Sequence, residues 1–284
     1  MKKILITGNS GYIGSHLSRL LNRSYDLWGL DISKPQFPVT DHVMADISKL
    51  AGMKLDLPVF DAVVHLAARV RVNESVRIPQ EYYQTNLFGT IEILDKIPCK
   101  NFIFASTGCA EYCNNPYAIS KRAAEDVVSQ QCEKLGIAHT IFRFYNVVGS
   151  LGFPPTNPDG LFYNLMRAEQ TGIFNIFGND YRTRDGTAER DYVHVDEICR
   201  ALQMAIENPA NGRENLGHGS GHTVREIAEL YQKVNDIQFR IEYQNRRTGD
   251  LERTVLDNPS RYMLKLYELD ELVKIPKNMQ SQLW

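Results

Sequence analysis

Near the N-terminus, a short apolar segment runs into a glycine-rich turn that opens a helical pattern. Residues 3–7 read Lys-Ile-Leu-Ile-Thr, and glycines follow at positions 8, 11 and 14. The first glycine permits a tight turn, the second lets the backbone approach a pyrophosphate, and the third allows the helix to pack closely on the strand. The start of the helix offers free N–H groups and a positive dipole to phosphates. This context predicts a dinucleotide-binding strand–turn–helix unit.

An acidic residue stands where such a unit would meet the adenosine ribose. Asp31 follows the second predicted strand, and a carboxylate there accepts hydrogen bonds from ribose hydroxyls and repels a 2′-phosphate. The pattern therefore favours NAD over NADP. Asp46 and Ile47 follow a short strand and are expected to meet the adenine. Ala67 and Ala68 end a later strand, where small side chains would let a cofactor lie close.

The first half of the chain alternates short apolar runs with helical patterns. The expected strands cover 3–7, 27–30, 62–66, 101–105 and 140–144, and the expected helices cover 12–21, 80–97 and 117–135. This alternation is typical of βαβ units, and continuously apolar strands indicate a sheet covered on both faces. The predicted fold class is therefore α/β, with a Rossmann-type doubly wound parallel sheet.

The pattern changes after a breaker-rich stretch at 151–160. The 284 residues allow one large or two small domains. We expect an NAD-binding Rossmann domain over 1–150 and a smaller α/β substrate lobe over 151–284, from which part of the Rossmann sheet can be completed. Within this lobe we expect helices over 161–170 and 195–207. Another should start at Thr223, which forms a capping box with Glu226.

Composition excludes several classes of function. The formal net charge is −2, so no basic surplus indicates nucleic acid or an anionic membrane as a partner. No apolar run reaches the ~20 residues of a membrane span. The five cysteines are odd in number and form no Cys-x-x-Cys pair, which argues against both zinc and a disulfide framework. We expect a cytoplasmic protein with reduced thiols and no metal site.

Tyr117 and Lys121 lie four residues apart at the start of a predicted helix, so they share one face. An ammonium group favours the phenolate, which can then take a proton from an alcohol. Ser106 and Thr107 follow a predicted strand at its carboxyl end, where ligands bind in open α/β sheets. These residues predict acid–base chemistry at that edge of the sheet.

Together these motifs resemble the extended short-chain dehydrogenase/reductases. The resemblance rests on the glycine loop, the His-Leu-Ala-Ala stretch at 65–68, Asn-Leu-Phe-Gly-Thr at 86–90, the Ser-Thr pair and the Tyr-x-x-x-Lys motif. The stretch 177–195 resembles the UDP-galactose (UDP-glucose) 4-epimerase signature. Arg-Arg-Thr-Gly-Asp at 246–250 is similar to the arginine and aspartate with which that family holds a nucleotide sugar.

The resemblance implies roles for the matching positions. Tyr117 would be the acid/base, Lys121 its electrostatic partner, and Thr107 the hydroxyl that bonds the sugar 4-oxygen; these three form the predicted catalytic set. The predicted cofactor-binding residues are Gly8, Gly11, Tyr12, Ile13, Gly14, Asp31, Asp46, Ile47, Leu66, Ala67, Ala68, Asn86, Tyr117 and Lys121. The predicted substrate-binding residues are Thr107, Asn146, Asn164, Leu165, Asn175, Phe177, Arg190, Arg247, Asp250 and Thr254.

The resemblance implies an NAD-dependent epimerase that interconverts the C4 epimers of a UDP-hexose or UDP-N-acetylhexosamine through a 4-keto intermediate. It also implies a homodimer, paired through the helices over 80–97 and 117–135. Three alternatives remain: a 4-keto-sugar reductase, a sugar-nucleotide dehydratase, and a non-catalytic nucleotide-binding protein. The chain departs from the epimerase pattern in its short connection at 113–116, where the family carries a longer loop that covers the cleft.

Overall fold

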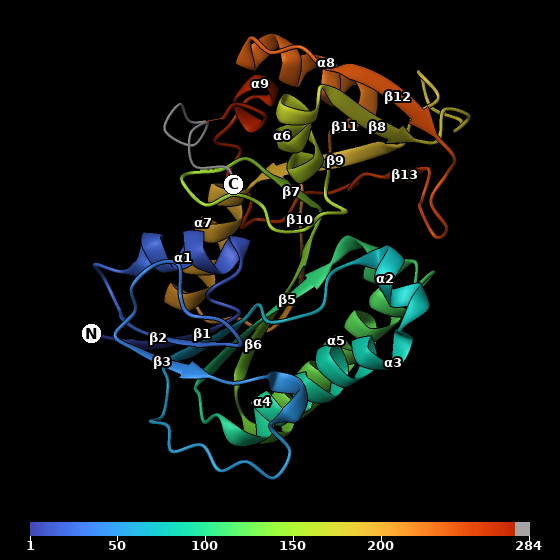
Figure 1. Ribbon diagram of the computed structural model, residues 1–284. Coiled ribbons are helices and arrows are strands. Elements are labelled where there is room, and N and C mark those ends of the chain that lie inside the picture. Colours follow the sequence, from blue (N-terminus) through green and yellow to red (C-terminus); the bar gives the residue numbers. More distant parts are fainter. Residues whose placement is uncertain (276–284) are drawn as a thin grey trace. The chain divides into compact units, whose positions relative to one another are not determined.

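A seven-stranded sheet is the largest in the computed structural model, which describes residues 1–275 (Figure 1). Its strand order is β10-β6-β5-β4-β1-β2-β3, and β3, β2, β1, β4 and β5 pair in parallel. The prediction of a doubly wound Rossmann-type sheet is therefore confirmed. The strands are β1 (Lys3–Thr7), β2 (Asp26–Asp31), β3 (Asp41–Met44), β4 (Ala62–His65), β5 (Asn101–Thr107), β6 (Ala138–Phe144) and β10 (Gly212–Leu216).

Helices cover both faces of this sheet. On one side lie α1 (Tyr12–Leu21) and α7 (Val195–Glu207), and on the other α4 (Gly89–Lys96) and α5 (Pro116–Leu135) (Figure 1). Every residue of β4 and β5 is buried as a result. The core beneath α4 and α5 includes Leu5, Phe60, Phe102, Phe104 and Ile141. This double covering explains why the central strands read as continuous apolar runs.

The helix expected over 80–97 is interrupted. It consists of α3 (Pro79–Tyr82), a π-helical segment η2 (Tyr83–Phe88) and α4, and an unpredicted helix α2 (Val72–Arg77) precedes it. Single turns of 3₁₀-helix form η1 (Ile47–Lys49) and η3 (Gly108–Glu111). Segments of π-helix occur frequently at functional sites, and η2 contains the predicted cofactor residue Asn86.

The second half of the chain builds smaller sheets. Strand β9 (Glu189–His194) lies between β11 (Gly221–Thr223) and β13 (Arg253–Thr254) and also pairs with β7 (Asn146–Val148), while β8 (Ile173–Phe177) pairs in parallel with β12 (Arg240–Gln244). The helices are α6 (Leu161–Thr171), α8 (Val224–Asn235) and α9 (Leu269–Leu272). The predicted capping box at Thr223 is present and starts α8.

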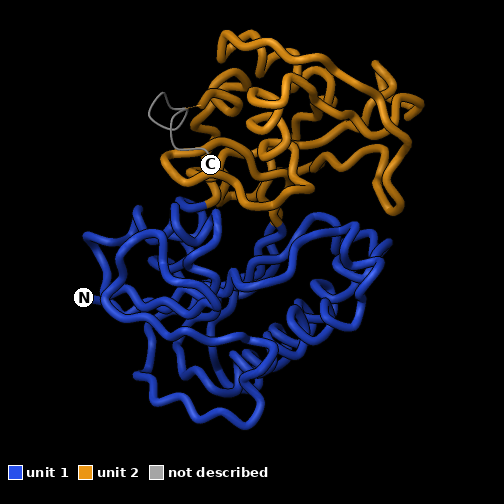
Figure 2. The backbone as a smooth tube through the Cα atoms, viewed as in Figure 1, with its two compact units in different colours: residues 1–143, 199–214 blue, residues 144–198, 215–284 orange. Residues whose placement is uncertain are grey.

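Two compact units divide the chain, and the first is discontinuous (Figure 2). It consists of residues 1–143 and 199–214, whereas the second contains 144–198 and the chain from 215 onward. The chain returns to the first unit because α7 ends there and β10 adds a strand beside β6. Residues 276–284 of the predicted lobe lie outside the described residues. Assigning a cofactor domain to 1–150 and a substrate lobe to 151–284 stays a prediction.

No helix within residues 1–275 combines the length and the apolar character needed to cross a membrane.

Candidate functional site

The glycine turn after β1 is shaped by backbone contacts that exclude side chains. Gly8 has a positive φ of 75°, and a Cβ there would lie 2.7 Å from the backbone nitrogen of Ala67. At Gly14 a Cβ would lie 2.1 Å from the carbonyl oxygen of Gly8. A Cβ at Gly11 would meet only that same oxygen, at 3.3 Å. The turn is thus closed around its first and third glycines and open at the second, as a phosphate-binding turn requires.

The Asp31 carboxylate at the end of β2 is bonded to this turn. Its Oδ2 accepts a hydrogen bond from the backbone N–H of Ser10 (3.1 Å), and Oδ1 accepts one from Ser33 (3.0 Å). A carboxylate has acceptor capacity for further donors, and Asp31 is partly exposed. The turn and Asp31 therefore fit a dinucleotide, with the phosphates at the glycines and a ribose at the carboxylate.

Other predicted cofactor residues also have structural roles: they begin a helix, cap a helix or pack in the core. Tyr12 and Ile13 open α1, directly after the turn. Asp46 caps η1 and accepts hydrogen bonds from the N–H (3.0 Å) and hydroxyl (2.7 Å) of Ser48. Burial acts to raise the pKa of Asp46, but these hydrogen bonds outweigh it and hold the pKa below its ordinary value. Ile47 packs in the core at 3% exposure, so only its backbone is available to a ligand.

The segment after β4 lies against the glycine turn. Leu66 donates its N–H to the carbonyl of Thr7, and Ala67 donates its N–H to the Thr7 hydroxyl at 3.2 Å. Ala68 follows and is partly buried. The small residues of this segment therefore sit beside Gly8, where they can border a bound cofactor.

Asn86 is buried in η2, and its amide is used internally. Its oxygen accepts the N–H of Arg69 (2.8 Å), while its nitrogen donates to the carbonyl of Arg69 (2.9 Å) and to the hydroxyl of Ser120 (3.1 Å). This residue was predicted to face the cofactor. The geometry instead gives it the task of holding the segment after β4 against α5, and its direct contact with a cofactor stays a prediction.

The predicted catalytic residues come from neighbouring elements, β5 and α5. Thr107 ends β5. The oxygen of Asn115 accepts the N–H of Ala118 (2.9 Å) and so caps α5, which places Tyr117 in the first turn. Lys121 lies one turn later, 3% exposed, with its Nζ 4.0 Å from the ring centroid of Phe104. The strand end and the first turns of the helix thus carry the whole set.

Burial controls the protonation of this pair. It raises the pKa of Tyr117 strongly, Cys109 adds to the effect, and a hydrogen bond with Thr107 opposes it. Burial lowers the pKa of Lys121 to about 7, against the influence of Glu125. Desolvation penalises both charged forms and so opposes the effect expected of Lys121 on the Tyr117 phenolate, which stays a prediction.

In the second unit, Arg190 and Asp250 form an ion pair with Nη2 and Oδ1 3.6 Å apart. Arg190 also donates to the carbonyl of Glu189 (2.9 Å). Thr254, at 6% exposure, pairs with Arg190 between β13 and β9. Three of the predicted substrate residues, Arg190, Asp250 and Thr254, are thus neighbours.

Arg247 extends this cluster. Its guanidinium lies 3.8 Å from the ring centroid of Phe177, and its Nη1 donates to the carbonyl of Asp159 (3.2 Å). The N–H of Asp250 donates to the carbonyl of Arg247 at 3.2 Å, which closes a turn. These contacts link Asp250 to Arg190 and Arg247, and Arg247 to the ring of Phe177. Arginines suit a diphosphate and an aromatic ring suits a flat base.

Four predicted substrate residues stand apart from these contacts. Asn164 donates to the carbonyls of Pro158 and Gly160, both at 2.8 Å, at the start of α6. Leu165 is fully buried in the core, which leaves only its backbone for a ligand. Asn175 is exposed on β8, and Asn146 on β7 donates to the carbonyl of Asp191 (3.1 Å).

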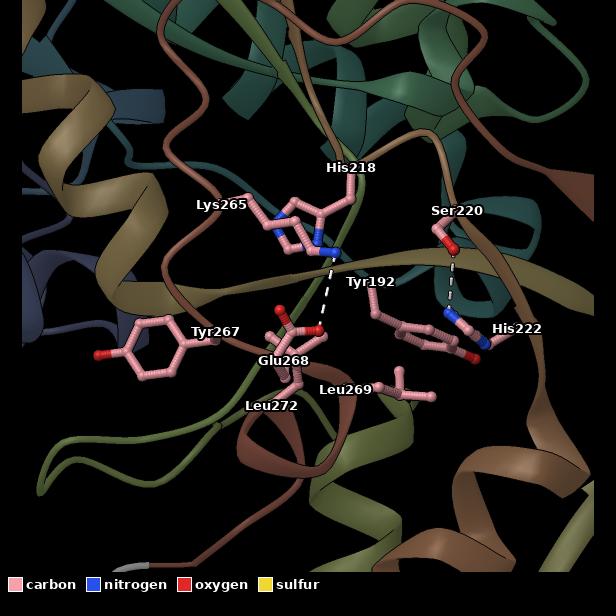
Figure 3. A pocket seen from close by; sticks show the side chains of 9 residues that line it. All are labelled: Tyr192, His218, Ser220, His222, Lys265, Tyr267, Glu268, Leu269 and Leu272. Atoms are coloured by element: carbon pink, nitrogen blue, oxygen red, sulfur yellow. Dashed lines mark hydrogen bonds and ion pairs between the residues drawn. The ribbon is translucent and has the colours of Figure 1, made fainter.

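A cavity of about 180 Å³ in the second unit involves none of these residues (Figure 3). Its polar lining includes Lys265 beside Glu268 and Ser220 beside His222. The full lining is Tyr192, His218, Ser220, His222, Lys265, Tyr267, Glu268, Leu269 and Leu272. The predicted substrate residues therefore do not form this cavity.

Sequence reasoning missed a buried carboxylate next to the catalytic set. Glu125 has no exposed surface and binds Ser106, Arg143 and Arg213. The signal was available, because Glu125 follows Lys121 by four residues on the same helix. Its two arginines could not be foreseen, since they come from distant strands.

Comparison with known proteins identifies the family. Residues 4–217 match the model of the NAD dependent epimerase/dehydratase family. The chain belongs to this family. UDP-arabinose 4-epimerase 1 of Arabidopsis thaliana is 31% identical over 93% of the chain and 74% of its own length.

Two solved structures are also similar. UDP-glucose 4-epimerase from Brucella ovis in complex with NAD has a TM-score of 0.84 and 27% identity, over 99% of this chain and 98% of that one. The UDP-Glc/GlcNAc 4-epimerase of Campylobacter jejuni has a TM-score of 0.76 and 29% identity, with both chains fully covered.

Proposed function

We propose that this member of the family is an NAD-dependent UDP-sugar 4-epimerase, an isomerase that inverts the configuration at C4 through a 4-keto sugar. The observation that carries the proposal is the placement of Thr107, Tyr117 and Lys121 together at the end of β5 and the start of α5. The similar proteins are named for different sugars but share UDP and C4. That shared chemistry supports the reaction more strongly than any one sugar.

The residues that would hold the cofactor are those of the glycine turn, Asp31 and Lys121. When bound, NAD supplies reversible hydride acceptance at the sugar carbon and a positive charge that favours the phenolate. The Gly11 backbone would approach the pyrophosphate, and Asp31 would accept hydrogen bonds from a ribose.

Tyr117 takes the proton from the C4 hydroxyl and returns it when the other epimer forms. Thr107 bonds to the sugar 4-oxygen and, through its contact with the Tyr117 hydroxyl, relays this proton. Lys121 supplies positive charge to the phenolate. A positioned acid/base of this kind accelerates a reaction typically by ~10²–10⁴-fold.

Residues of the second unit would bind the nucleotide part of the UDP-sugar. Arg190 and Arg247 would bind the diphosphate oxygens, for which arginine geometry is well suited. Asp250 would bind the ribose, and Phe177 would line the base together with Asn175. Asn164, the Leu165 backbone and Asn146 would complete the contacts to the diphosphate and sugar.

The residues after Thr107 argue against a dehydratase, and Asp31 argues against a reductase. A dehydratase of this family usually has an Asp-Glu pair directly after the threonine, whereas Gly108 and Cys109 stand there. A 4-keto-sugar reductase would usually prefer NADPH, which the Asp31 carboxylate would repel.

Thr254 is proposed to border the sugar. Its small side chain would admit a 2-acetamido group, so we propose both UDP-hexoses and UDP-N-acetylhexosamines as substrates. Because Thr254 is buried, Thr254→Ser and Thr254→Val are the variants of choice. A change in the ratio of kcat/KM for UDP-glucose and UDP-N-acetylglucosamine would support the assignment. An equal change in kcat/KM for both sugars would mean that Thr254 does not border the sugar.

We further propose a cytoplasmic homodimer. The five cysteines, which all lie within the described residues, form no disulfide bond, as is typical of proteins in a reducing compartment.

The decisive experiment combines two measurements on the purified protein. Denaturation should release NAD⁺ in near-equimolar amount, because the epimerase regenerates its cofactor in each turnover. Incubation with UDP-glucose, UDP-arabinose or UDP-N-acetylglucosamine should yield the C4 epimer without added cofactor. Reduction of a 4-keto sugar at the expense of added NADPH, with no epimer formed, would identify a reductase instead.

A further inference from the structure

A buried ionic cluster lies on α5, one turn beyond Lys121. The Glu125 carboxylate has no exposed surface, and Arg143 on β6 binds both of its oxygens through Nε and Nη2 at 2.8 Å each. Arg213 on β10 adds a contact of 2.9 Å through Nε, and the hydroxyl of Ser106 donates at 2.5 Å. One carboxylate therefore ties α5 to three strands of the sheet.

This cluster shares its elements with the catalytic residues. Tyr117, Lys121 and Glu125 are spaced by four along α5 and so occupy one face of the helix. On β5, Ser106 immediately precedes Thr107, and Phe104 lies under the Lys121 ammonium. Since residues two apart on a strand face the same side, Phe104 and Ser106 both point toward α5.

Glu125 is a buried negative charge among Lys121, Arg143 and Arg213, and the exposed Asp126 also binds Arg213 (3.1 Å). Two arginines bind Glu125, and Lys121 lies in a buried environment that disfavours an ammonium group. Two titratable groups interact with Lys121 electrostatically, namely Glu125 on α5 and the neutral His65 on β4. The next groups outward are Cys109 on η3, which acts on Tyr117, and Arg143 on β6 and Arg213 on β10, which bind Glu125.

We propose that Glu125 is a positioning residue for the 4-epimerase reaction: it provides the negative charge that retains the Lys121 ammonium, and it fixes the strand end that carries Thr107. The expected effect of Glu125 on kcat rests on the proposed function. Its expected effect on the pKa of Lys121 does not. Arg143 and Arg213 hold the carboxylate in place. The hydrogen bond from Ser106 then fixes the end of β5 to this carboxylate.

The test compares variants that disturb the same cluster with opposite electrostatic sign. Glu125→Gln removes the negative charge, whereas Arg213→Gln removes a positive one and leaves the carboxylate paired with Arg143. The measurement is the titration of Lys121, followed by NMR of ¹³Cε-labelled lysine and assigned with Lys121→Met. The wild-type midpoint is expected near the pKa of about 7. It should fall by about one pH unit in Glu125→Gln, and rise in Arg213→Gln.

Enzyme kinetics provide the second readout. In Glu125→Gln we expect kcat to fall at least about fivefold at neutral pH, with its alkaline limb moved to lower pH and KM little changed. Glu125→Asp retains the charge and should restore the wild-type pH profile even if stability drops. If the glutamine variant fails to fold, the test is Arg213→Gln, in which the Lys121 midpoint should rise.

Two results would overturn the proposal. One is an unchanged Lys121 titration in folded Glu125→Gln or, if that variant does not fold, in Arg213→Gln. The other is a shift in the same direction in Glu125→Gln and Arg213→Gln, which would indicate a purely structural role. If the wild type lacked epimerase activity, the proposed function would fail, and the NMR titration would still decide the electrostatic role of Glu125.

Discussion

Tyr117 is held between two opposing influences. Burial favours its neutral phenol, whereas the hydrogen bond with Thr107 favours the phenolate. An alcohol substrate needs a proton acceptor only when the sugar is in place, so a phenol that stays protonated until then is protected from unproductive ionisation. The side chain is thus suited to transfer a proton in both directions.

Replacing Tyr117 with phenylalanine removes the hydroxyl and keeps the ring. We expect turnover to fall by roughly 10²–10⁴-fold, while folding and NAD content are retained. Steady-state kinetics and the NAD⁺ released on denaturation measure the two effects. Phe104→Leu is a contrasting variant, since it disturbs Lys121 without removing a proton carrier. Near-normal turnover in Tyr117→Phe would mean that another group carries the proton.

Asp31 determines which dinucleotide can bind. Its carboxylate lies at the glycine turn and would repel a 2′-phosphate, so calorimetry on protein stripped of cofactor should show tighter binding of NAD than of NADP. Asp31→Asn removes the charge and should reduce the difference in affinity between NAD and NADP. Asp41, on the edge strand β3, is a control because its substitution by asparagine should leave the preference unchanged. Preference for NADP in the wild type would refute this assignment.

At the scale of elements, the glycine turn depends on contact between β1 and α1. Gly14→Ala would place a Cβ 2.1 Å from the carbonyl oxygen of Gly8, an atom that cannot move without opening the turn. We expect this variant to lose bound NAD and to melt at lower temperature. Gly52→Ala is the control for NAD content: its φ of 76° makes alanine strained there, but nothing lies within 4 Å of its Cβ position, so NAD should be retained. Normal NAD content in Gly14→Ala would contradict the role of this contact.

The elements that could be predicted are those with a strong local signal. The strand at 3–7 and the helices at 12–21 and 195–207 have the predicted bounds, because apolar runs and helical periodicity specify them. Strand β10 reads Gly-Arg-Glu-Asn-Leu and is mostly exposed, so only its pairing with β6 makes it a strand. The π-helical segment η2 was not predicted, and it contains Asn86, whose amide bonds to Arg69 and Ser120.

Some residues of the candidate site could be predicted from the sequence, and the contacts of others could not. Residue types and spacing indicated Gly8, Asp31, Tyr117 and Lys121. The internal use of the Asn86 amide and the burial of Leu165 depend on packing that no local pattern encodes.

At the scale of the whole molecule, exposed apolar side chains on η2 and α5 favour association of two copies. Phe88 is 51% exposed and Ile119 40%. We expect light scattering at micromolar concentration to give twice the chain mass of 32.4 kDa. Phe88→Asp should give the monomer mass. Val59→Asp replaces a similarly exposed apolar residue outside both elements and should leave the dimer intact. A monomeric wild type would count against pairing through these helices.

Acid should destabilise the molecule through His65. Burial lowers its pKa to about 3, and its nitrogens bond to the hydroxyls of Thr7 (2.6 Å) and Thr90 (2.9 Å). Because the folded pKa lies below the unfolded value, the contribution is complete above about pH 6.5 and is lost as the pH falls toward 3. Between pH 7 and pH 5 we expect a loss of about 2 kcal/mol in the free energy of unfolding.

Urea unfolding at several pH values measures this slope. In His65→Asn the slope should be flatter, whatever the absolute stability of the variant. An equally steep slope would show that other groups account for the acid sensitivity.

The return of the chain to the first unit has a consequence for its synthesis. On the ribosome, β6 emerges long before β10, with residues 145–211 made between them. At about 5–20 residues per second, the nascent sheet presents β6 as an open edge for several seconds. An open edge is a template for pairing with other chains. Ribosomal stalling before residue 212 should therefore produce aggregation-prone nascent chains, whereas stalling after β10 has emerged should not.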